Sequence, residues 1–119
     1  MKTIRILLAE DEETNRGIME LQLSRLAGVV CDSAPDGREA LRLFGQRRYD
    51  LAILDQYLPG FNGDELARLM LASDPNLVLL AVTADPDQAE PLRRAGFSKI
   101  FIKPLRRSEL RETILEYTT

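Results

Sequence analysis

Five side chains that could bind a metal ion or a phosphate group each follow a short apolar stretch of the chain. They are Glu10, Asp11, Asp55, Thr83 and Lys103. Carboxylates brought close together repel one another and raise a pKa unless a cation lies between them. Oxygen ligands with no histidine or thiolate nearby favour a hard ion such as Mg²⁺, which keeps several waters and accepts a phosphate oxygen. A carboxylate nucleophile, a metal ion, a lysine and a hydroxyl together indicate phosphoryl transfer through an aspartyl phosphate.

The composition excludes several other kinds of chemistry. The chain has no histidine, which rules out a Ser-His-Asp or Cys-His nucleophile, a zinc site with histidine ligands and an internal phosphohistidine. Its single cysteine, Cys31, has no partner in the chain and is expected to be a buried strand residue. The net charge is −3 and the basic residues form separate pairs, so direct binding of nucleic acid is not expected.

The five residues can meet only in a fold that brings the ends of several strands together. Short apolar runs bounded by polar residues recur at Ile4–Ala9, Val29–Cys31, Leu51–Leu54, Leu77–Val82 and Ile100–Ile102. Such continuous runs are typical of strands buried on both faces of a parallel sheet. Between them, the spacing of apolar residues becomes helical. The residues predicted to face the core are Ile18, Leu21, Leu23 and Leu26; Gly37, Ala40, Leu41 and Phe44; Leu66, Leu69 and Met70; and Leu110, Ile114 and Tyr117. Gly28 and Gly45 are expected to end helices.

A strand followed by a helix, five times over, predicts an α/β fold. We expect a doubly wound, five-stranded parallel sheet with helices on both faces and the flavodoxin-like strand order 2-1-3-4-5. Ligands of such sheets bind beyond the carboxyl ends of the strands, which is where the five polar residues would lie. The 119 residues, 45% of them apolar, suffice for one domain over residues 1–119 with one core.

Four short motifs resemble those of a known family. They are Glu10-Asp11-Glu12, Asp55-Gln56-Tyr57-Leu58-Pro59-Gly60, Val82-Thr83-Ala84 and Lys103-Pro104. In this order and over essentially the whole chain, they resemble the receiver domains of bacterial response regulators, the phosphoacceptor modules of two-component signal transduction. The segment 9–16, Ala-Glu-Asp-Glu-Glu-Thr-Asn-Arg, further resembles receivers attached to hybrid sensor histidine kinases.

The resemblance implies a metal site and a phosphoacceptor. Asp55 would be the nucleophile that becomes phosphorylated. Asp11 and Asp55 would bind Mg²⁺ directly, together with the backbone carbonyl of Tyr57. Glu10 would act on the ion through a metal-bound water.

The resemblance also implies how the phosphoryl group is held and who supplies it. Lys103 would pair with the phosphoryl oxygens, Thr83 would hydrogen-bond to them, and the small Ala84 would leave the site open. The Lys103–Pro104 peptide would be cis. The phosphodonor would be a histidine kinase, and a histidine phosphotransfer protein or domain is a second expected partner. The chain would act as an acceptor domain with phosphotransfer and autodephosphorylation chemistry rather than as a conventional enzyme.

Other readings fit less well. Haloacid-dehalogenase-like phosphatases also use an aspartate nucleophile, but need a second aspartate two positions later, where this chain has Tyr57. A nucleotide-binding module would have a glycine-rich loop after the first strand, and this loop is acidic. Inactive receivers usually lack the phosphoacceptor or the lysine, and both are present. No segment approaches the ~20 apolar residues of a membrane span and no signal-peptide pattern opens the chain, so we expect a cytoplasmic domain that does not contact membranes.

The region that reports phosphorylation in receivers departs from the family pattern. Ile100 occupies the place of the aromatic residue that turns inward, and Phe101 should face the opposite side of its strand. Pro91 would disrupt a helix that started at Pro86, so we expect a short or displaced helix beginning near Pro91. We therefore favour a domain that passes the phosphoryl group onward. A stand-alone regulator that acts by phosphorylation-controlled protein binding is the alternative.

Overall fold

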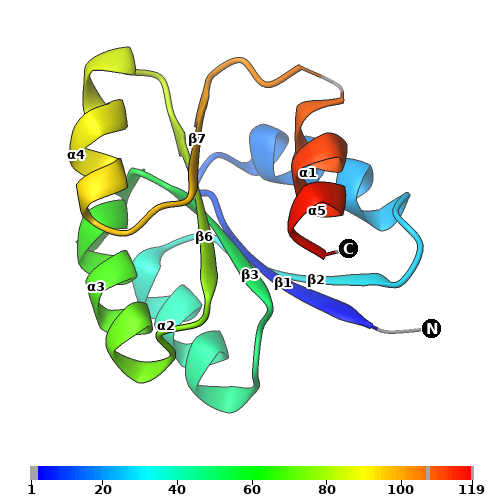
Figure 1. Ribbon diagram of the computed structural model, residues 1–119, viewed down its shortest axis with the longest axis horizontal. Helices are drawn as coiled ribbons and strands as arrows, with labels where there is room; N and C mark the ends of the chain where they lie inside the picture. The colour runs from blue at the N-terminus through cyan, green and yellow to red at the C-terminus, as the bar shows by residue number, and fades with distance from the viewer. Residues whose placement is uncertain (1–2, 107, 119) are drawn as a thin grey trace.

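Five parallel strands form one sheet in the computed structural model, which describes residues 3–106 and 108–118 (Figure 1). The strands are β1 (Ile4–Ala9), β2 (Val29–Ala34), β3 (Leu51–Asp55), β6 (Val78–Thr83) and β7 (Lys99–Ile102). Their order across the sheet is β2-β1-β3-β6-β7. This is the predicted flavodoxin-like order, with the five main strands counted along the chain.

Helices cover both faces of the sheet, as predicted. They are α1 (Glu13–Ser24), α2 (Gly37–Gln46), α3 (Gly63–Ser73), α4 (Ala89–Arg94) and α5 (Glu109–Thr118). Figure 1 shows α1 and α5 on one face and α2, α3 and α4 on the other. Each face has its own buried apolar cluster, and β3 lies between them with every residue buried. The sheet is therefore a rigid base for the residues at its strand ends.

The sequence pattern assigned some helical residues to the wrong face. Ile18 and Leu21 of α1 were expected in the core, but their side chains are 52% and 54% exposed. The buried residues of α1 are Met19 and Leu23, which lie four positions apart on one face of the helix. Leu69 of α3, also expected in the core, is 50% exposed.

Neither glycine ends a helix, although the sequence predicted that both would. Helix α1 ends at Ser24 with Arg25 as its C-cap, and Gly28 lies further on, in the turn before β2, with a φ of +79° that favours glycine. Gly45 lies inside the last turn of α2, which continues to Gln46. It was therefore wrong to expect these residues to end the helices.

A small hairpin that the sequence did not predict follows β3. It consists of β4 (Tyr57–Leu58) and β5 (Phe61–Asn62), which pair antiparallel. Gly60 lies at its tip with a φ of +85°. The hairpin turns the chain from the end of β3 directly into α3.

The helix expected between Thr83 and Ile100 is short, as predicted. A 3₁₀ turn, η1 (Pro86–Gln88), leads into the six residues of α4. The helix begins at Ala89 rather than at Pro91. Pro91 still falls in the first turn, where its missing N–H removes no helical hydrogen bond.

The two faces of β7 also match the expectation. Ile100 packs against the cluster on the α4 side of the sheet, whereas Phe101 is buried in the cluster on the α1 and α5 side. Phe101 therefore cannot take the place of an aromatic residue at position 100.

Candidate functional site

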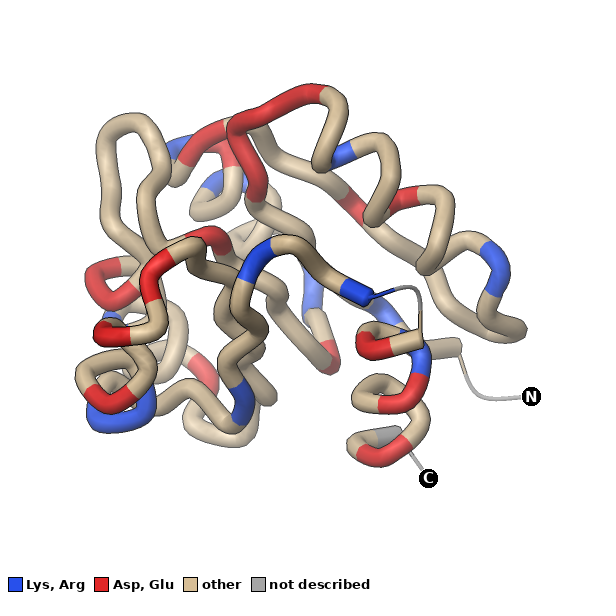
Figure 2. Tube along the Cα trace, turned by 90° about the horizontal axis from the view of Figure 1, so that it is seen from above, with Lys and Arg blue, Asp and Glu red and all other residues tan. Residues whose placement is uncertain are grey.

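Three carboxylates meet at the carboxyl ends of β1 and β3. Glu10 and Asp11 follow β1, and Asp55 is the last residue of β3, which pairs with β1. Each residue offers one carboxylate oxygen, and these three oxygens lie within 4.8 Å of one another. Glu10 and Asp55 are buried, whereas Asp11 is exposed. Residues 10–13 form the longest acidic run of the chain, which Figure 2 shows as a continuous red stretch.

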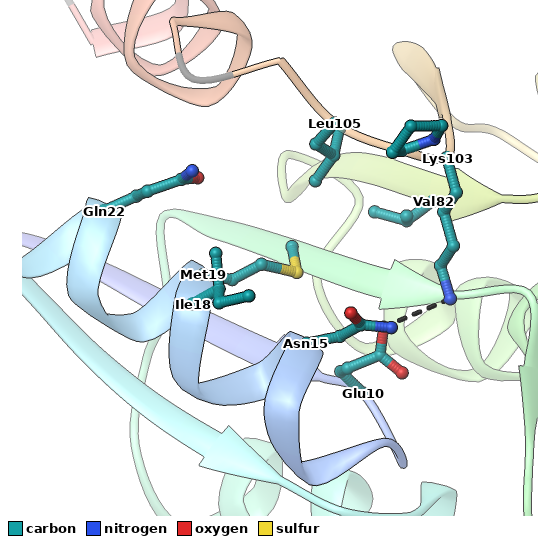
Figure 3. Close-up of a pocket in the computed structure, with 9 residues that line it drawn as sticks. Glu10, Asn15, Ile18, Met19, Gln22, Val82, Lys103 and Leu105 are labelled. Carbon is teal, nitrogen blue, oxygen red and sulfur yellow. Dashed lines mark ion pairs between the residues drawn. The ribbon is translucent and has the colours of Figure 1, made fainter.

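Lys103 places its ammonium group against two of these carboxylates. Its Nζ donates a hydrogen bond of 2.9 Å to Asp55 Oδ2 and lies 3.2 Å from Glu10 Oε1, the pair drawn in Figure 3. The backbone N–H of Lys103 donates to the carbonyl oxygen of Thr83, at 2.9 Å. The Lys103–Pro104 peptide is cis, as predicted. The fold therefore brings together Lys103 and Asp55, which are 48 positions apart in sequence.

The site changes the acidity of its buried groups. Burial, followed by the adjacent Asp55 carboxyl group, raises the pKa of Glu10 to about 7. Burial disfavours the charge on Lys103, but the hydrogen bond and the charge of Asp55, together with Glu10, raise the pKa of the ammonium group above its usual range. The centre therefore places several carboxyl groups close together, with the positive charge of one lysine to offset theirs.

The donor set fits a hard divalent cation. All three side chains that could bind an ion here supply carboxylate oxygens, the ligands that Mg²⁺ prefers. Among the residues that the structure describes, Glu10 Oε1 is a buried oxygen with the Lys103 ammonium 3.2 Å away but no well-formed hydrogen bond. A hydrated cation would satisfy this oxygen and reduce the repulsion between the carboxylates.

Glu12 has a different task from its acidic neighbours. Its carboxylate caps the N-terminus of α1 by accepting hydrogen bonds from the backbone N–H groups of Thr14 and Asn15. These bonds, the one from Asn15 first, lower the pKa of Glu12. The cap fixes where α1 starts, and Arg16 in its first turn donates to the carbonyl oxygen of Glu10. The helix start therefore helps to hold the loop that carries Glu10 and Asp11.

Thr83 is the last residue of β6 rather than the first residue after it, and its hydroxyl group already has partners. The buried Oγ1 donates to Gln56 Oε1 at 2.8 Å and accepts from the backbone N–H of Asp85 at 3.1 Å. Gln56 in turn donates from Nε2 to Gln88 Oε1 at 2.7 Å. Sequence analysis did not single out Gln56 as a functional residue. Its only signal was a large polar residue directly after Asp55, at the end of a buried strand.

The backbone around Gln56 is fixed from both sides. Its N–H donates to the carbonyl oxygen of Val82 at 3.0 Å, and its own carbonyl oxygen accepts from Gly63 at 2.6 Å. A Cβ atom on Gly63 would lie 3.0 Å from Gln56 Cα and 3.1 Å from the carbonyl oxygen of Asp55. Glycine at the start of α3 therefore allows this helix to approach the end of β3.

A groove of about 380 Å³ leads away from the acidic centre between α1 and the segment after β7. Figure 3 shows side chains from both elements around it. Its lining consists of Glu10, Asn15, Ile18, Met19, Gln22, Val82, Lys103, Pro104 and Leu105. The exposed side chain of Ile18 is thus part of an apolar surface that continues into the site.

Fold and site together define an α/β domain with an acidic centre at its strand ends, and comparison with known proteins identifies the class. The family model of the response regulator receiver domain matches residues 6–115. This chain belongs to that family.

Relatives and solved structures agree with the family. The chain is 35% identical to the sensor histidine kinase AruS of Pseudomonas aeruginosa and 34% identical to the sensor protein EvgS of Escherichia coli K12, over 100% and 86% of its length. It spans only 12% and 9% of these relatives. The matched regions are receiver regions of hybrid sensor kinases, which confirms the predicted likeness. The response regulator TrrA of Thermotoga maritima, solved in complex with Mg(2+)-BeF, is 30% identical with a TM-score of 0.87, and the match covers 98% of this chain and 99% of TrrA.

No helix within residues 3–106 and 108–118 is both long enough and apolar enough to cross a membrane.

Proposed function

We propose that this chain is a single receiver domain that accepts a phosphoryl group on Asp55 from a phosphohistidine of a histidine kinase. A carboxylate oxygen of Asp55 forms a bond to phosphorus as the phosphorus–nitrogen bond of the donor breaks. The electron pair of the broken bond stays on the imidazole nitrogen. The observation that carries this proposal is the contact between Asp55 and Lys103, beside two further carboxylates, in a chain of the receiver family.

The surrounding residues would hold the transferred group and its cation. Asp11 and Asp55 would bind Mg²⁺, with the carbonyl oxygen of Tyr57 as a further ligand and Glu10 acting through a bound water. When bound, the ion neutralises charge on the phosphoryl oxygens. Proximity of their oxygens supports the carboxylate part of this assignment, whereas the Tyr57 carbonyl is carried over from the family motif.

Lys103 and Thr83 would contact the phosphoryl oxygens. The ammonium group of Lys103 is already 2.9 Å from Asp55 Oδ2, so it can pair with a phosphoryl oxygen after a small movement. Thr83 ends the neighbouring strand, β6, and its hydroxyl group would donate a second hydrogen bond. Both contacts favour the acyl phosphate, which is then lost either to a partner or by hydrolysis within the domain.

The groove beside Lys103 is the proposed binding site for the histidine-bearing donor protein. It opens at Glu10 and Lys103 and continues along the apolar side chains of Ile18 and Leu105. A donor protein could bury these side chains while its histidine reaches Asp55.

We favour onward transfer to a histidine phosphotransfer protein over direct output. Its support is the likeness to receiver regions of hybrid kinases and the aliphatic Ile100 in β7. Direct output by phosphorylation-controlled binding is the alternative. Mixing the phosphorylated domain with candidate phosphotransfer proteins separates the two, because onward transfer moves the label to a histidine. Phosphorylation-dependent binding to a target with no transfer would contradict the relay. A cytoplasmic location stays a prediction.

The decisive experiment for the acceptor role is incubation with acetyl phosphate and Mg²⁺ followed by intact mass measurement. We expect a gain of about 80 Da, one phosphoryl group on a carboxylate nucleophile, that is absent in Asp55→Asn and absent when the metal is chelated. A matched control is Asp50→Asn, an exposed position at the opposite end of β3, which should keep the adduct. An adduct that persists in Asp55→Asn would overturn the assignment.

A further inference from the structure

We infer that Gln56 is a positioning residue that restrains the Thr83 hydroxyl group in the resting domain and links its release to the start of the fourth helix. This inference rests on the proposed function, because it concerns the hydroxyl group that would contact the phosphoryl oxygens. It deepens that function by naming the hydrogen bonds through which phosphorylation of Asp55 would affect α4.

The first step is the single proton of Thr83. A hydroxyl group can donate only one hydrogen bond, and Thr83 donates it to Gln56 Oε1 at 2.8 Å. Its oxygen also accepts from the N–H of Asp85. Thr83 can therefore donate to a phosphoryl oxygen only after its bond to Gln56 breaks. The resting arrangement opposes the contact that the phosphorylated state needs.

The second step is the consequence for Gln56. Its side chain is only 6% exposed, and a buried amide oxygen that loses its partner is unfavourable until it finds another. The backbone of Gln56 is bonded to Val82 on one side and Gly63 on the other, so the side chain, not the backbone, must respond. A cavity of about 360 Å³ between α3 and α4, lined by Gln56 and Gln88, gives the side chain room to move.

The third step carries the change to the fourth helix. Gln56 Nε2 donates to Gln88 Oε1 at 2.7 Å, and Gln88 is both the last residue of η1 and the residue that precedes α4. η1 has no buried residue, and the one buried residue of α4 is Leu92. This segment therefore has few contacts that would resist a movement of Gln88.

This path does not pass through position 100. The aromatic side chain of the family pattern is absent from the α4 side of β7, where Ile100 packs instead. The Thr83–Gln56–Gln88 chain supplies a hydrogen-bonded connection between the same strand end and the same helix. Both of its links join residues far apart in sequence.

The test uses Gln56→Met, which keeps the size of the side chain and removes both hydrogen bonds. Phosphorylation by acetyl phosphate with Mg²⁺ should become about threefold to tenfold faster, the range that one lost intramolecular hydrogen bond allows. Hydrogen exchange over residues 85–94 is measured with and without beryllium fluoride and Mg²⁺, a lasting stand-in for the phosphoryl group. In the unchanged domain, beryllium fluoride should change the rate of hydrogen exchange over these residues. In Gln56→Met this change should be lost.

Gln88→Ala provides a second variant at a half-exposed position, so the test does not depend on the folding of Gln56→Met. It breaks only the link to α4, because Thr83 keeps its bond to Gln56. We expect a phosphorylation rate close to that of the unchanged domain, with the response over 85–94 lost. Gln46→Met, the same chemical change at the exposed end of α2, should alter neither measurement.

The outcomes distinguish this inference from the proposed function. Slower phosphorylation in Gln56→Met, or an unchanged response over 85–94 in both variants, would overturn the inference while the acceptor role of Asp55 stands. No phosphoryl adduct on the unchanged domain would overturn the proposed function, and the inference with it. A side chain that only stabilised the fold would not speed phosphorylation when replaced.

Discussion

The acidic centre and the fourth-helix segment, residues 85–94, are built in opposite ways. The centre stands on β1 and β3, whose facing residues are almost completely buried, and Lys103 bonds directly to Asp55. The fourth-helix segment consists of one 3₁₀ turn and six helical residues, with Leu92 as its buried side chain. Rigid strand ends suit chemistry that needs fixed distances, whereas a weakly packed segment can change its conformation at little cost.

The largest effect should come from the lysine of the acidic centre. Lys103→Met removes the cation that would stabilise the phosphoryl oxygens, and losing one such group typically lowers a rate about a hundredfold to a thousandfold. The rate of adduct formation with acetyl phosphate and Mg²⁺, followed by intact mass, measures the loss. Lys99→Met is the matched control, because Lys99 begins the strand that Lys103 directly follows and has its ammonium group over the ring of Phe101. Equal rates for the two variants would contradict the role of Lys103.

Metal binding should stabilise the centre and depend on Asp11. A ligand that binds only the folded state stabilises it by about 2.7 kcal/mol at a hundred times its dissociation constant. Thermal unfolding with and without Mg²⁺ should show this gain in the unchanged domain and in Glu13→Gln, whose exposed carboxylate lies in the first turn of α1. The gain should disappear in Asp11→Asn. If Asp11→Asn gains as much as the control, the cluster of Glu10, Asp11 and Asp55 is not the binding site.

Two leucines compare the packing of the two regions directly. Leu54, next to Asp55 in β3, and Leu92 in α4 are both almost fully buried. Leu54→Ala should lower the free energy of unfolding by about 2–5 kcal/mol, the usual range for such a truncation. Leu92→Ala should cost less in urea denaturation, because the short helix can open locally without unfolding the sheet. Equal losses would show that the fourth-helix segment is as firmly held as the strands.

The smallest effect concerns Cys31 in the edge strand β2, which was expected to be buried and is only partly buried. Burial raises the pKa of its thiol to about 11, so the folded state binds the proton more tightly than the unfolded state. Stability due to this residue is therefore unchanged at neutral pH and falls as pH rises from the ordinary value of 9.0 toward about 11. The difference in unfolding free energy between the unchanged domain and Cys31→Ala should shrink over that interval. A difference independent of pH would mean that folding does not shift the pKa of this thiol.

Some of the fold followed from local patterns in the sequence. Leu51–Leu54 and Ile4–Ala9 are long enough, and apolar enough, to specify strands buried on both faces, and the structure extends them little. Val29–Cys31 marked only the first half of β2. The residues of this edge strand are mostly only partly buried, and its polar second half looks like a loop in the sequence. The exposed Ile18 and Leu21 misled the helical pattern, because apolar residues on a surface have the same sequence signal as those in a core.

The sequence by itself determined the acidic centre. Once the apolar runs define parallel strands, the residues after them must meet at one edge of the sheet, and Glu10, Asp55 and Lys103 do so within hydrogen-bonding or ion-pair distance. Only the tertiary structure decided what Thr83 does at rest. Its bond to Gln56 spans 27 positions, and the bond from Gln56 to Gln88 spans 32. No spacing rule predicts such pairs, because they depend on how α3, α4 and the strand ends pack around one buried amide.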